Sequence, residues 1–397
     1  MDFSVALWSD LPLEILEQVL SYLHVPDLCR YRTVCKRWDR LMCNPKFGSL
    51  CAQNTAKRDA SLIAMRYSIC ARRHEGWCFL DVNARRWYVV KDDGQGIRRN
   101  FPRGNVTMDG GLVCQYLLND LGPDRIIVYN PITQTHRKLP CTSKYFSKLT
   151  LVVDNIFQSF KIILFNIPRK EPWIFNAPSK LVYDSVTNEW KTSTSPICIS
   201  SGSKLLGSRV IFQGYVYVCF YSYHCGDDYR PLWRYNLVND ACENLDVPIR
   251  GEFSISACFV VSANRLFLVA WSKGGGLGFD DGGPSWSFQL SELKIPDMTR
   301  EVLFEMPTAD VVERFETGFK NRWPSLPRMP SLPRISAFSF GNSILFMSMS
   351  TGISAAFDVV TRSWDRNFPP NPLEYLPDED CEWVGEQMNL LLPCTLW

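Results

Sequence analysis

One short pattern recurs six times after residue 77: an apolar strand, a polar turn, and a second strand that opens near a Trp or a residue in its place. The second strands are marked by Trp87, His136, Trp190, Cys242, Val302 and Trp364. These markers lie 49, 54, 52, 60 and 62 residues apart. A unit this small cannot bury its apolar face alone, so copies at a regular period have to stack on one another. The chain is therefore predicted to fold largely as a repetitive β array.

The chemistry of the turns supports this prediction. Five of the six turns open on an Asp or an Asn, for example Asp184 and Asn236. Either side chain can accept hydrogen bonds from the turn amides, and the Trp adds a large surface that packs between neighbouring sheets. Apolar runs ahead of four turns indicate further strands, at 111–114, 215–218, 265–269 and 344–347.

Residues 77–397 resemble a kelch-type β-propeller, in which blades recur at about 50 residues. The resemblance implies an all-β fold, and the six copies of the pattern predict six blades. This sequence departs from a strict kelch repeat in two respects. The double glycine appears clearly only at Gly110-Gly111, and His136, Cys242 and Val302 stand where three copies lack the Trp.

The two ends of the repeat section are predicted to meet. Little strand pattern precedes Trp77, so the first copy is expected to have only its last two strands. Two apolar runs, 381–384 and 389–392, belong to no copy. We predict that they pair with residues 77–91, which closes the ring and removes two open sheet edges.

The N-terminal segment has a different, helical pattern. Pro12 can occupy a helix entry without losing a bonded amide, and apolar residues from Ile15 to Leu23 recur at helical spacing. Two more short helices are predicted after Val25 and after Lys36. A unit of about forty residues leaves a large part of its apolar surface in water, so a partner is expected to cover the remainder.

Residues 11–16 (Leu-Pro-Leu-Glu-Ile-Leu) and 34–38 (Val-Cys-Lys-Arg-Trp) resemble an F-box. In that family the helices dock on the Skp1-type adaptor of a cullin-RING ubiquitin ligase. The resemblance implies an adaptor-binding set of Leu11, Pro12, Ile15, Leu16, Val19, Leu20, Leu28, Val34, Cys35 and Trp38. The alternative is a small helical bundle that packs only on its own chain.

Three regions follow from these patterns, in an α+β multidomain chain. We expect a three-helix F-box at 8–50, an ordered and partly helical linker at 51–76, and the propeller at 77–397. This layout is similar to that of plant F-box/kelch-repeat proteins, including the groups named for unusual floral organs and for Hawaiian skirt.

Composition excludes several classes of function. The chain has 43 basic and 41 acidic residues, so no strong field would recruit nucleic acid or an anionic membrane. Its fifteen Cys are scattered without a CxxC pair, which is typical of buried free thiols in a reducing compartment. No run of about twenty apolar residues occurs. We expect a protein of the nucleus or cytoplasm that has no metal, cofactor or membrane span.

The long connections between strands are expected to gather on one face, where aromatic residues beside charges favour protein binding. The substrate-binding candidates on these connections are Arg98, Arg99, Arg169, Lys170, Trp173, Phe175, Tyr223, Asp227, Asp228, Tyr229, Phe279, Asp280 and Asp281. The alternative for each aromatic residue is that it only fills its own loop.

Together these patterns favour a non-catalytic substrate-recognition subunit of an SCF (Skp1-cullin-F-box) ubiquitin ligase. Its partners would be a Skp1-type adaptor, the cullin and RING subunits reached through it, and a protein substrate such as a transcription factor. One alternative is a scaffold or transcriptional co-regulator without substrate turnover. A kelch-propeller oxidase is the other, but copper oxidases need clustered His and Tyr ligands, and the four His of this chain are scattered.

Overall fold

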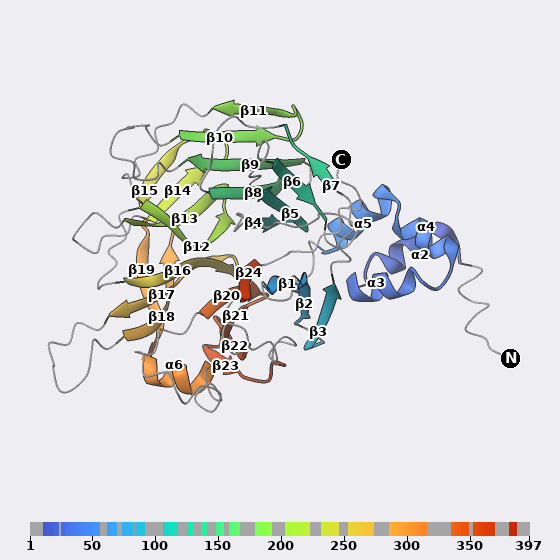
Figure 1. Cartoon of the computed structure of the whole chain (residues 1–397). Coiled ribbons are helices and arrows are strands. Elements are labelled where there is room, and N and C mark those ends of the chain that lie inside the picture. The colour runs from blue at the N-terminus through green and yellow to red at the C-terminus, as the bar shows by residue number, and fades with distance from the viewer. Residues whose placement is uncertain are drawn as a thin grey trace.

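The structure, a computed structural model, has a helical unit at one side and an array of β-sheets at the other (Figure 1). The described residues are 11–23, 25–55, 62–69, 74–82, 84–91, 106–117, 125–130, 136–140, 148–154, 159–166, 179–192, 203–222, 232–245, 253–273, 286–315, 335–348, 352–369 and 381–386.

The helical unit contains α2 (Leu13–Leu20), α3 (Val25–Tyr31), α4 (Lys36–Met42) and α5 (Pro45–Thr55). Its apolar core consists of Leu16, Leu20, Leu28, Leu41, Met42, Phe47 and Cys51. The sequence predicted a three-helix unit bounded at residues 8–50, followed by a partly helical linker from residue 51. The fourth helix, α5, runs on to Thr55, and its Phe47 and Cys51 side chains complete the core.

A buried polar contact ties α5 to the end of α2. Asn54 Nδ2 donates a hydrogen bond to Ser21 Oγ at 2.6 Å, and Ser21 Oγ donates to the Gln18 carbonyl oxygen at 2.7 Å. Both side chains are buried. A buried polar group that is paired in this way avoids the cost of desolvation without a partner. The helical unit therefore includes α5 and does not end where the predicted linker begins.

The described strands form six four-stranded antiparallel sheets, which we call the sheet array. The first sheet contains β24 (Cys381–Glu386), β1 (Leu62–Ile69), β2 (His74–Asp81) and β3 (Arg86–Lys91). The second contains β4 (Val106–Asp109), β5 (Leu112–Leu117), β6 (Arg125–Tyr129) and β7 (His136–Lys138). The third contains β8 (Lys148–Asp154), β9 (Ser159–Asn166), β10 (Ser179–Asp184) and β11 (Glu189–Thr192).

The other three sheets repeat this order. The fourth contains β12 (Ser203–Phe212), β13 (Tyr215–Ser222), β14 (Leu232–Asn236) and β15 (Cys242–Leu245). The fifth contains β16 (Phe253–Ser262), β17 (Arg265–Lys273), β18 (Trp286–Lys294) and β19 (Thr299–Pro307). The sixth contains β20 (Ile335–Phe340), β21 (Ser343–Ser348), β22 (Ser354–Asp358) and β23 (Ser363–Asp365). A helix, α6 (Thr308–Phe315), follows β19. Each of the six predicted strand-turn-strand units coincides with the third and fourth strands of one sheet.

The turns between third and fourth strands have the predicted chemistry. Asp184 Oδ1 accepts a hydrogen bond from the Val186 amide at 2.8 Å, and Asp358 Oδ1 accepts from the amides of Val360 and Thr361. Short acceptors of this kind satisfy turn amides that no strand can pair. A residue with positive φ precedes the fourth strand in five of the sheets, and these residues are Arg85, Asn188, Asp240, Met298 and Arg362.

The first sheet differs from the prediction in two respects. The strand β1 occupies part of the expected linker and pairs with β2 from Leu62 opposite Asp81 to Ile69 opposite His74. The C-terminal strand β24 pairs with β1 and not with residues 77–91. The boundary predicted at residue 77 is therefore corrected to Leu62, and the pairing of 381–384 is corrected to β1. Basic residues interrupt the apolar alternation around β1, which hides its strand pattern. The run 389–392 lies outside the described residues.

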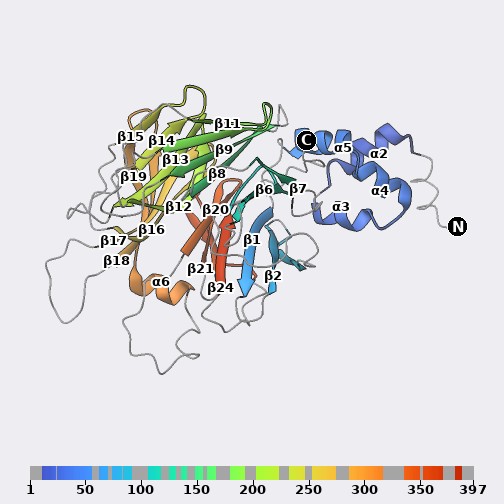
Figure 2. The same ribbon diagram turned by 45° about the horizontal axis from the view of Figure 1, so that its top comes forward.

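Apolar clusters fill the space between neighbouring sheets. Leu112 of the second sheet shares a cluster with Ile162 of the third, and similar clusters join the third to the fourth, the fourth to the fifth and the fifth to the sixth. Ile63 and Leu80 of the first sheet share a cluster with Leu345 of the sixth. The first and last sheets therefore pack on each other, and Figure 2 shows β1 and β24 beside β20 and β21.

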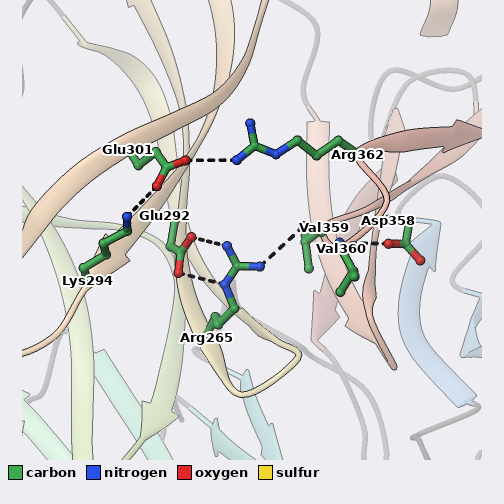
Figure 3. A network of polar contacts seen from close by, with 8 residues as sticks. All are labelled: Arg265, Glu292, Lys294, Glu301, Asp358, Val359, Val360 and Arg362. Carbon is green, nitrogen blue, oxygen red and sulfur yellow. Dashed lines mark hydrogen bonds and ion pairs between the residues drawn. The ribbon is translucent and has the colours of Figure 1, made fainter.

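A polar network on the fifth sheet reaches the sixth (Figure 3). The guanidinium of Arg265 binds the carboxylate of Glu292 and also donates to the Val359 carbonyl oxygen. Glu301 accepts from Lys294 at 2.6 Å and from Arg362 of the sixth sheet at 2.9 Å. Hydrogen bonds from Lys294 and Arg362 hold the pKa of the Glu301 carboxyl below its ordinary value.

This arrangement predicts a dependence of stability on pH. A carboxylate with a lowered pKa stabilises the folded state above its ordinary pKa of 4.5, and this contribution is lost as the pH falls below it. We expect Glu301→Gln to unfold at a lower temperature than the wild type at pH 7, and the difference to shrink below pH 4.5. Thermal unfolding followed by circular dichroism at several pH values measures this. Glu189→Gln, which changes an exposed carboxylate on β11, is the control. A difference that stays constant with pH would contradict the role given to Glu301.

Candidate functional site

Exposed apolar side chains are concentrated on the helical unit. Among the described residues, eleven large hydrophobic side chains are exposed, and six of them lie between residues 13 and 34. These six, which we call the helical patch, are Leu13, Ile15, Val19, Tyr22, Tyr31 and Val34. Scattered exposed apolar residues are ordinary on a protein surface, whereas a group on one small unit indicates an interaction site.

The apolar stripe of α2 divides lengthwise into two halves. Successive helical residues are about 100° apart, which puts Ile15, Val19 and Tyr22 on one arc and Leu16 and Leu20 on the next. Leu16 and Leu20 are fully enclosed in the core, while Ile15 is 50% exposed and Val19 is 40% exposed. The outer arc therefore offers apolar surface that nothing in the described chain covers.

The structure separates the predicted adaptor-binding residues into two groups. Leu16, Leu20 and Leu28 are buried in the helical core, so their direct contact with a partner is corrected to a structural role. Their periodicity could not show this, because both arcs of α2 are apolar. The others are at least partly exposed, and they are Leu11, Pro12, Ile15, Val19, Val34, Cys35 and Trp38. The sequence did not single out Leu13, Tyr22 and Tyr31 as contacts, although all three belong to the helical patch.

Local contacts fix the second part of the patch, at the turn between α3 and α4. The rings of Tyr31 and Trp38 meet edge to face with centroids 5.7 Å apart. Arg32 Nε donates to Asp39 Oδ1 at 2.9 Å, and Arg37 Nη2 donates to the Leu11 carbonyl oxygen at 3.3 Å. These contacts hold Val34, which is 61% exposed, at the tip of the turn. The helical patch therefore lies on an ordered surface that needs little reorganisation to bind.

The helical unit lies against one end of the first sheet. The guanidinium carbon of Arg30 on α3 is 5.7 Å from the centroid of the Tyr88 ring on β3, and Arg86 lies 5.6 Å from the same ring. The chain leaves α5 and enters β1 at Leu62, which is opposite Asp81, where the turn to β3 begins. The connection between the second and third strands of this sheet runs from Ile69 to His74, at the end of the sheet away from the helical unit. The second-to-third connections of the other sheets leave the corresponding end. Both views show the helical unit beside this sheet (Figures 1 and 2).

The thirteen predicted substrate-binding residues, from Arg98 to Asp281, all lie outside the described residues. They remain predictions. Eight of them belong to connections between a second and a third strand: β9 to β10 and β13 to β14. The three residues at 279–281 lie between β17 and β18, which are also the second and third strands of a sheet. Arg98 and Arg99 lie between β3 and β4, the connection from the first sheet to the second.

Seven cysteines in the described part of the chain are free, and they differ in exposure. Cys51, Cys78 and Cys114 are buried as predicted, but Cys35 and Cys43 at the two ends of α4 are exposed. Burial raises the pKa of the Cys78 thiol to about 12, and it also raises that of Cys114. Within the described ranges, no cluster of three or more His, Cys, Asp or Glu side chains could hold a metal ion. No helix in the described part of the chain is both long and apolar enough to cross a membrane.

Comparison with known proteins places the helical unit in a family. A profile for F-box-like domains matches residues 8–47. This stretch contains α2, α3, α4 and the start of α5. It also contains every residue of the helical patch.

Three relatives from Arabidopsis thaliana extend the similarity into the sheet array. F-box only protein 6 is 26% identical over 200 residues, which cover 48% of this chain and 38% of that protein. An F-box/kelch-repeat protein is 25% identical over 232 residues, with 55% of this chain and 53% of that protein covered. UNUSUAL FLORAL ORGANS is 23% identical over 392 residues, with coverage of 90% and 78%. The first two alignments span about half or less of the relatives' own length.

Solved structures are similar at low TM-scores. The β-propeller domain of the trilobed protease from Pyrococcus furiosus has a TM-score of 0.38 and 12% identity, covering 77% of this chain and 79% of that one.

Proposed function

We propose that this chain, an F-box-like protein related to plant F-box/kelch-repeat proteins, is the non-catalytic substrate-recognition subunit of an SCF ubiquitin ligase. Its helical unit binds a Skp1-type adaptor, and its sheet array binds the protein substrate. The observation that carries this proposal is the helical patch, where Ile15, Val19 and Val34 expose apolar surface within the F-box-like match. Burying such side chains drives association, and each stabilises a complex by up to about 1.5 to 3 kcal/mol when fully covered.

The arrangement of the two parts supports this role. The helical unit lies at the end of the first sheet where β2 turns into β3. The long connections β9 to β10, β13 to β14 and β17 to β18 leave the other end of their sheets. A receptor with this layout would hold its substrate away from the adaptor, and proximity would raise the local concentration of substrate lysines near the transferring enzyme.

We also infer that the six sheets are the blades of one closed propeller. Two junctions between sheets share the same contact, which supports this inference. Trp190 Nε1 of the third sheet donates to the Pro140 carbonyl oxygen, beyond the last strand of the second, at 3.0 Å. Trp87 Nε1 of the first sheet donates to the Pro369 carbonyl oxygen, beyond the last strand of the sixth, at 3.1 Å. The sixth sheet therefore lies next to the first in the same way that the second sheet lies next to the third. A closed ring requires this relation between the last sheet and the first.

Affinity capture from native plant extract tests the proposed function. The wild-type chain and the Ile15→Asp/Val19→Asp variant serve as baits. We expect adaptor and cullin with the wild type only, and substrate candidates with both baits because the sheet array is unchanged. Recovery of adaptor without cullin would favour a scaffold without turnover. Absence of adaptor from the wild-type bait would reject the receptor role.

A further inference from the structure

A fully buried lysine lies at the junction between the third and fourth sheets. Lys180, the second residue of β10, is 0% exposed. A buried ammonium group is costly unless hydrogen-bond acceptors surround it. Its Nζ atom lies 3.1 Å from the carbonyl oxygen of Asp240 and 2.8 Å from Oδ1 of the same residue. Because Asp240 belongs to the turn between β14 and β15, the fourth sheet holds the lysine of the third.

The third acceptor of this ammonium group is a cysteine sulfur. Lys180 Nζ donates to Sγ of Cys242, the first residue of β15, at 3.8 Å. The centroid of the Tyr235 ring lies 3.9 Å from Nζ, and Tyr235 Oη donates to Asp240 Oδ1 at 2.6 Å. A lysine ammonium has three hydrogens to donate, and an aromatic ring attracts its charge. The carboxylate, the carbonyl and the ring therefore hold Nζ beside the sulfur.

The surroundings of Cys242 favour its reaction with an oxidant. A positive charge beside a cysteine stabilises the thiolate, which is the form that oxidants attack. For comparison, the sulfur of Cys43 lies 3.8 Å from a carboxylate oxygen of Asp39. Cys242 is partly exposed, whereas Cys78 and Cys114 are buried. A small oxidant such as hydrogen peroxide can therefore reach the one sulfur that a buried lysine contacts at this junction.

We propose that Lys180 and Cys242 form a redox-sensitive pair, which hydrogen peroxide joins by a covalent bond between Nζ and Sγ. The thiolate attacks peroxide, the O–O bond breaks, and the sulfur becomes a sulfenic acid while hydroxide leaves. The hydroxide takes one proton from the ammonium of Lys180 and becomes water. The amine then displaces the sulfenic hydroxyl, which takes a second proton from the nitrogen and leaves as water. One peroxide is reduced to two molecules of water, and the sulfur is oxidised once.

The bond ties the third sheet to the fourth. Its two residues are 62 positions apart in the sequence, and a cross-link over a long stretch of chain restricts the unfolded state. The connection from β9 to β10 ends just before Lys180, because β10 begins at Ser179, so the bond also fixes one end of that connection. Thiols reverse a sulfur–nitrogen bond of this kind. The pair does not depend on adaptor binding.

Peptide mapping of the full-length chain under non-reducing conditions tests the proposal. The purified chain is treated with hydrogen peroxide, its remaining thiols are alkylated, and it is digested with trypsin. A linked Lys180 is no longer cleaved, so we expect peptide 171–191 joined to peptide 235–250. The mass of the linked pair should be lower than the sum of the two peptides by two hydrogen atoms. Dithiothreitol added before digestion should abolish the linked pair.

Variants separate the two chemical steps. Cys242→Ser should give no linked pair. Lys180→Arg keeps the positive charge, but a guanidinium stays protonated and does not condense, so the sulfenic acid of Cys242 should accumulate and be trapped by dimedone. Cys43→Ser, which changes an exposed thiol of the helical unit, should link as the wild type does.

The folded and unfolded wild-type chains decide the outcome without any variant. Peroxide treatment in guanidinium chloride should give no linked pair, because the contact between Nζ and Sγ is lost. Recovery of Cys242 from the folded chain as a thiol, or as an oxidised residue without the linked pair, would overturn the proposal. Equal yields from folded and unfolded chains would overturn it too. Adaptor capture by the reduced chain is measured separately, so failure of either proposal leaves the other intact.

Discussion

Replacing Ile15 and Val19 by Asp is expected to weaken binding of a purified Skp1-type adaptor by about 100-fold or more. Both side chains lie on the outer arc of α2, so the double variant removes apolar contact from the middle of the helical patch. Because both side chains are already partly buried in the free chain, losing their further burial in the complex weakens binding by roughly 1 kcal/mol for each. Placing two carboxylates in an apolar interface adds a desolvation cost. A total of about 3 kcal/mol corresponds to roughly 100-fold in the dissociation constant, which isothermal titration calorimetry measures.

The matched control for this variant is Val238→Asp. Val238 is 91% exposed at a turn of the fourth sheet, so it accepts an Asp without loss of packing. The Val238→Asp variant should bind the adaptor as the wild type does. Folding of the double variant is checked by its thermal unfolding, which should change little because neither side chain is in the core. A double variant that folds and binds with wild-type affinity would show that the helical patch is not the adaptor site.

Removing β24 is expected to destabilise the sheet array severely. The strand pairs with β1 over six residue pairs, from Ala64 opposite Glu386 to Ile69 opposite Cys381. At about one hydrogen bond per pair and about 1 kcal/mol net for each, the ladder alone contributes roughly 6 kcal/mol. Its loss also leaves β1 as an open edge. The free energy of unfolding of a small domain is only about 5 to 15 kcal/mol, so this loss is comparable to the total stability.

Two truncations isolate the contribution of β24. A chain that ends at Glu386 keeps the strand, and one that ends at Asp380 lacks it. We expect the longer chain to show a cooperative thermal transition, and the shorter one to lose that transition or to aggregate during purification. Equal melting temperatures would contradict the role given to β24.

Local patterns in the sequence predict most of the sheet array. The Asp or Asn that opens five of the six turns identifies the third and fourth strands, because a short acceptor such as Asp184 or Asp358 satisfies the turn amides. The strand β1 escapes prediction for a physical reason. Its two neighbours are β2 and β24, and β24 is more than three hundred residues away in sequence, so no local pattern indicates the pairing.

The candidate site is predictable only in part. The helical spacing of Ile15 and Leu16 shows that α2 has an apolar stripe, but burial of one arc depends on α5, whose Phe47 and Cys51 complete the core. Tyr22 and Tyr31 carry no signal of their own, because an aromatic residue in a short helix is as often core as surface.

Hydrogen–deuterium exchange on the full-length chain, with and without a purified Skp1-type adaptor, tests the central claim most directly. The amides of α2, of α3 and of the turn to α4 should exchange more slowly in the complex, because the helical patch between Leu13 and Val34 becomes covered. The strands from β4 to β23 should exchange as in the free chain. Protection confined to the sheet array, or no protection at a saturating adaptor concentration, would contradict the assignment of the helical unit as the adaptor-binding part of a substrate receptor.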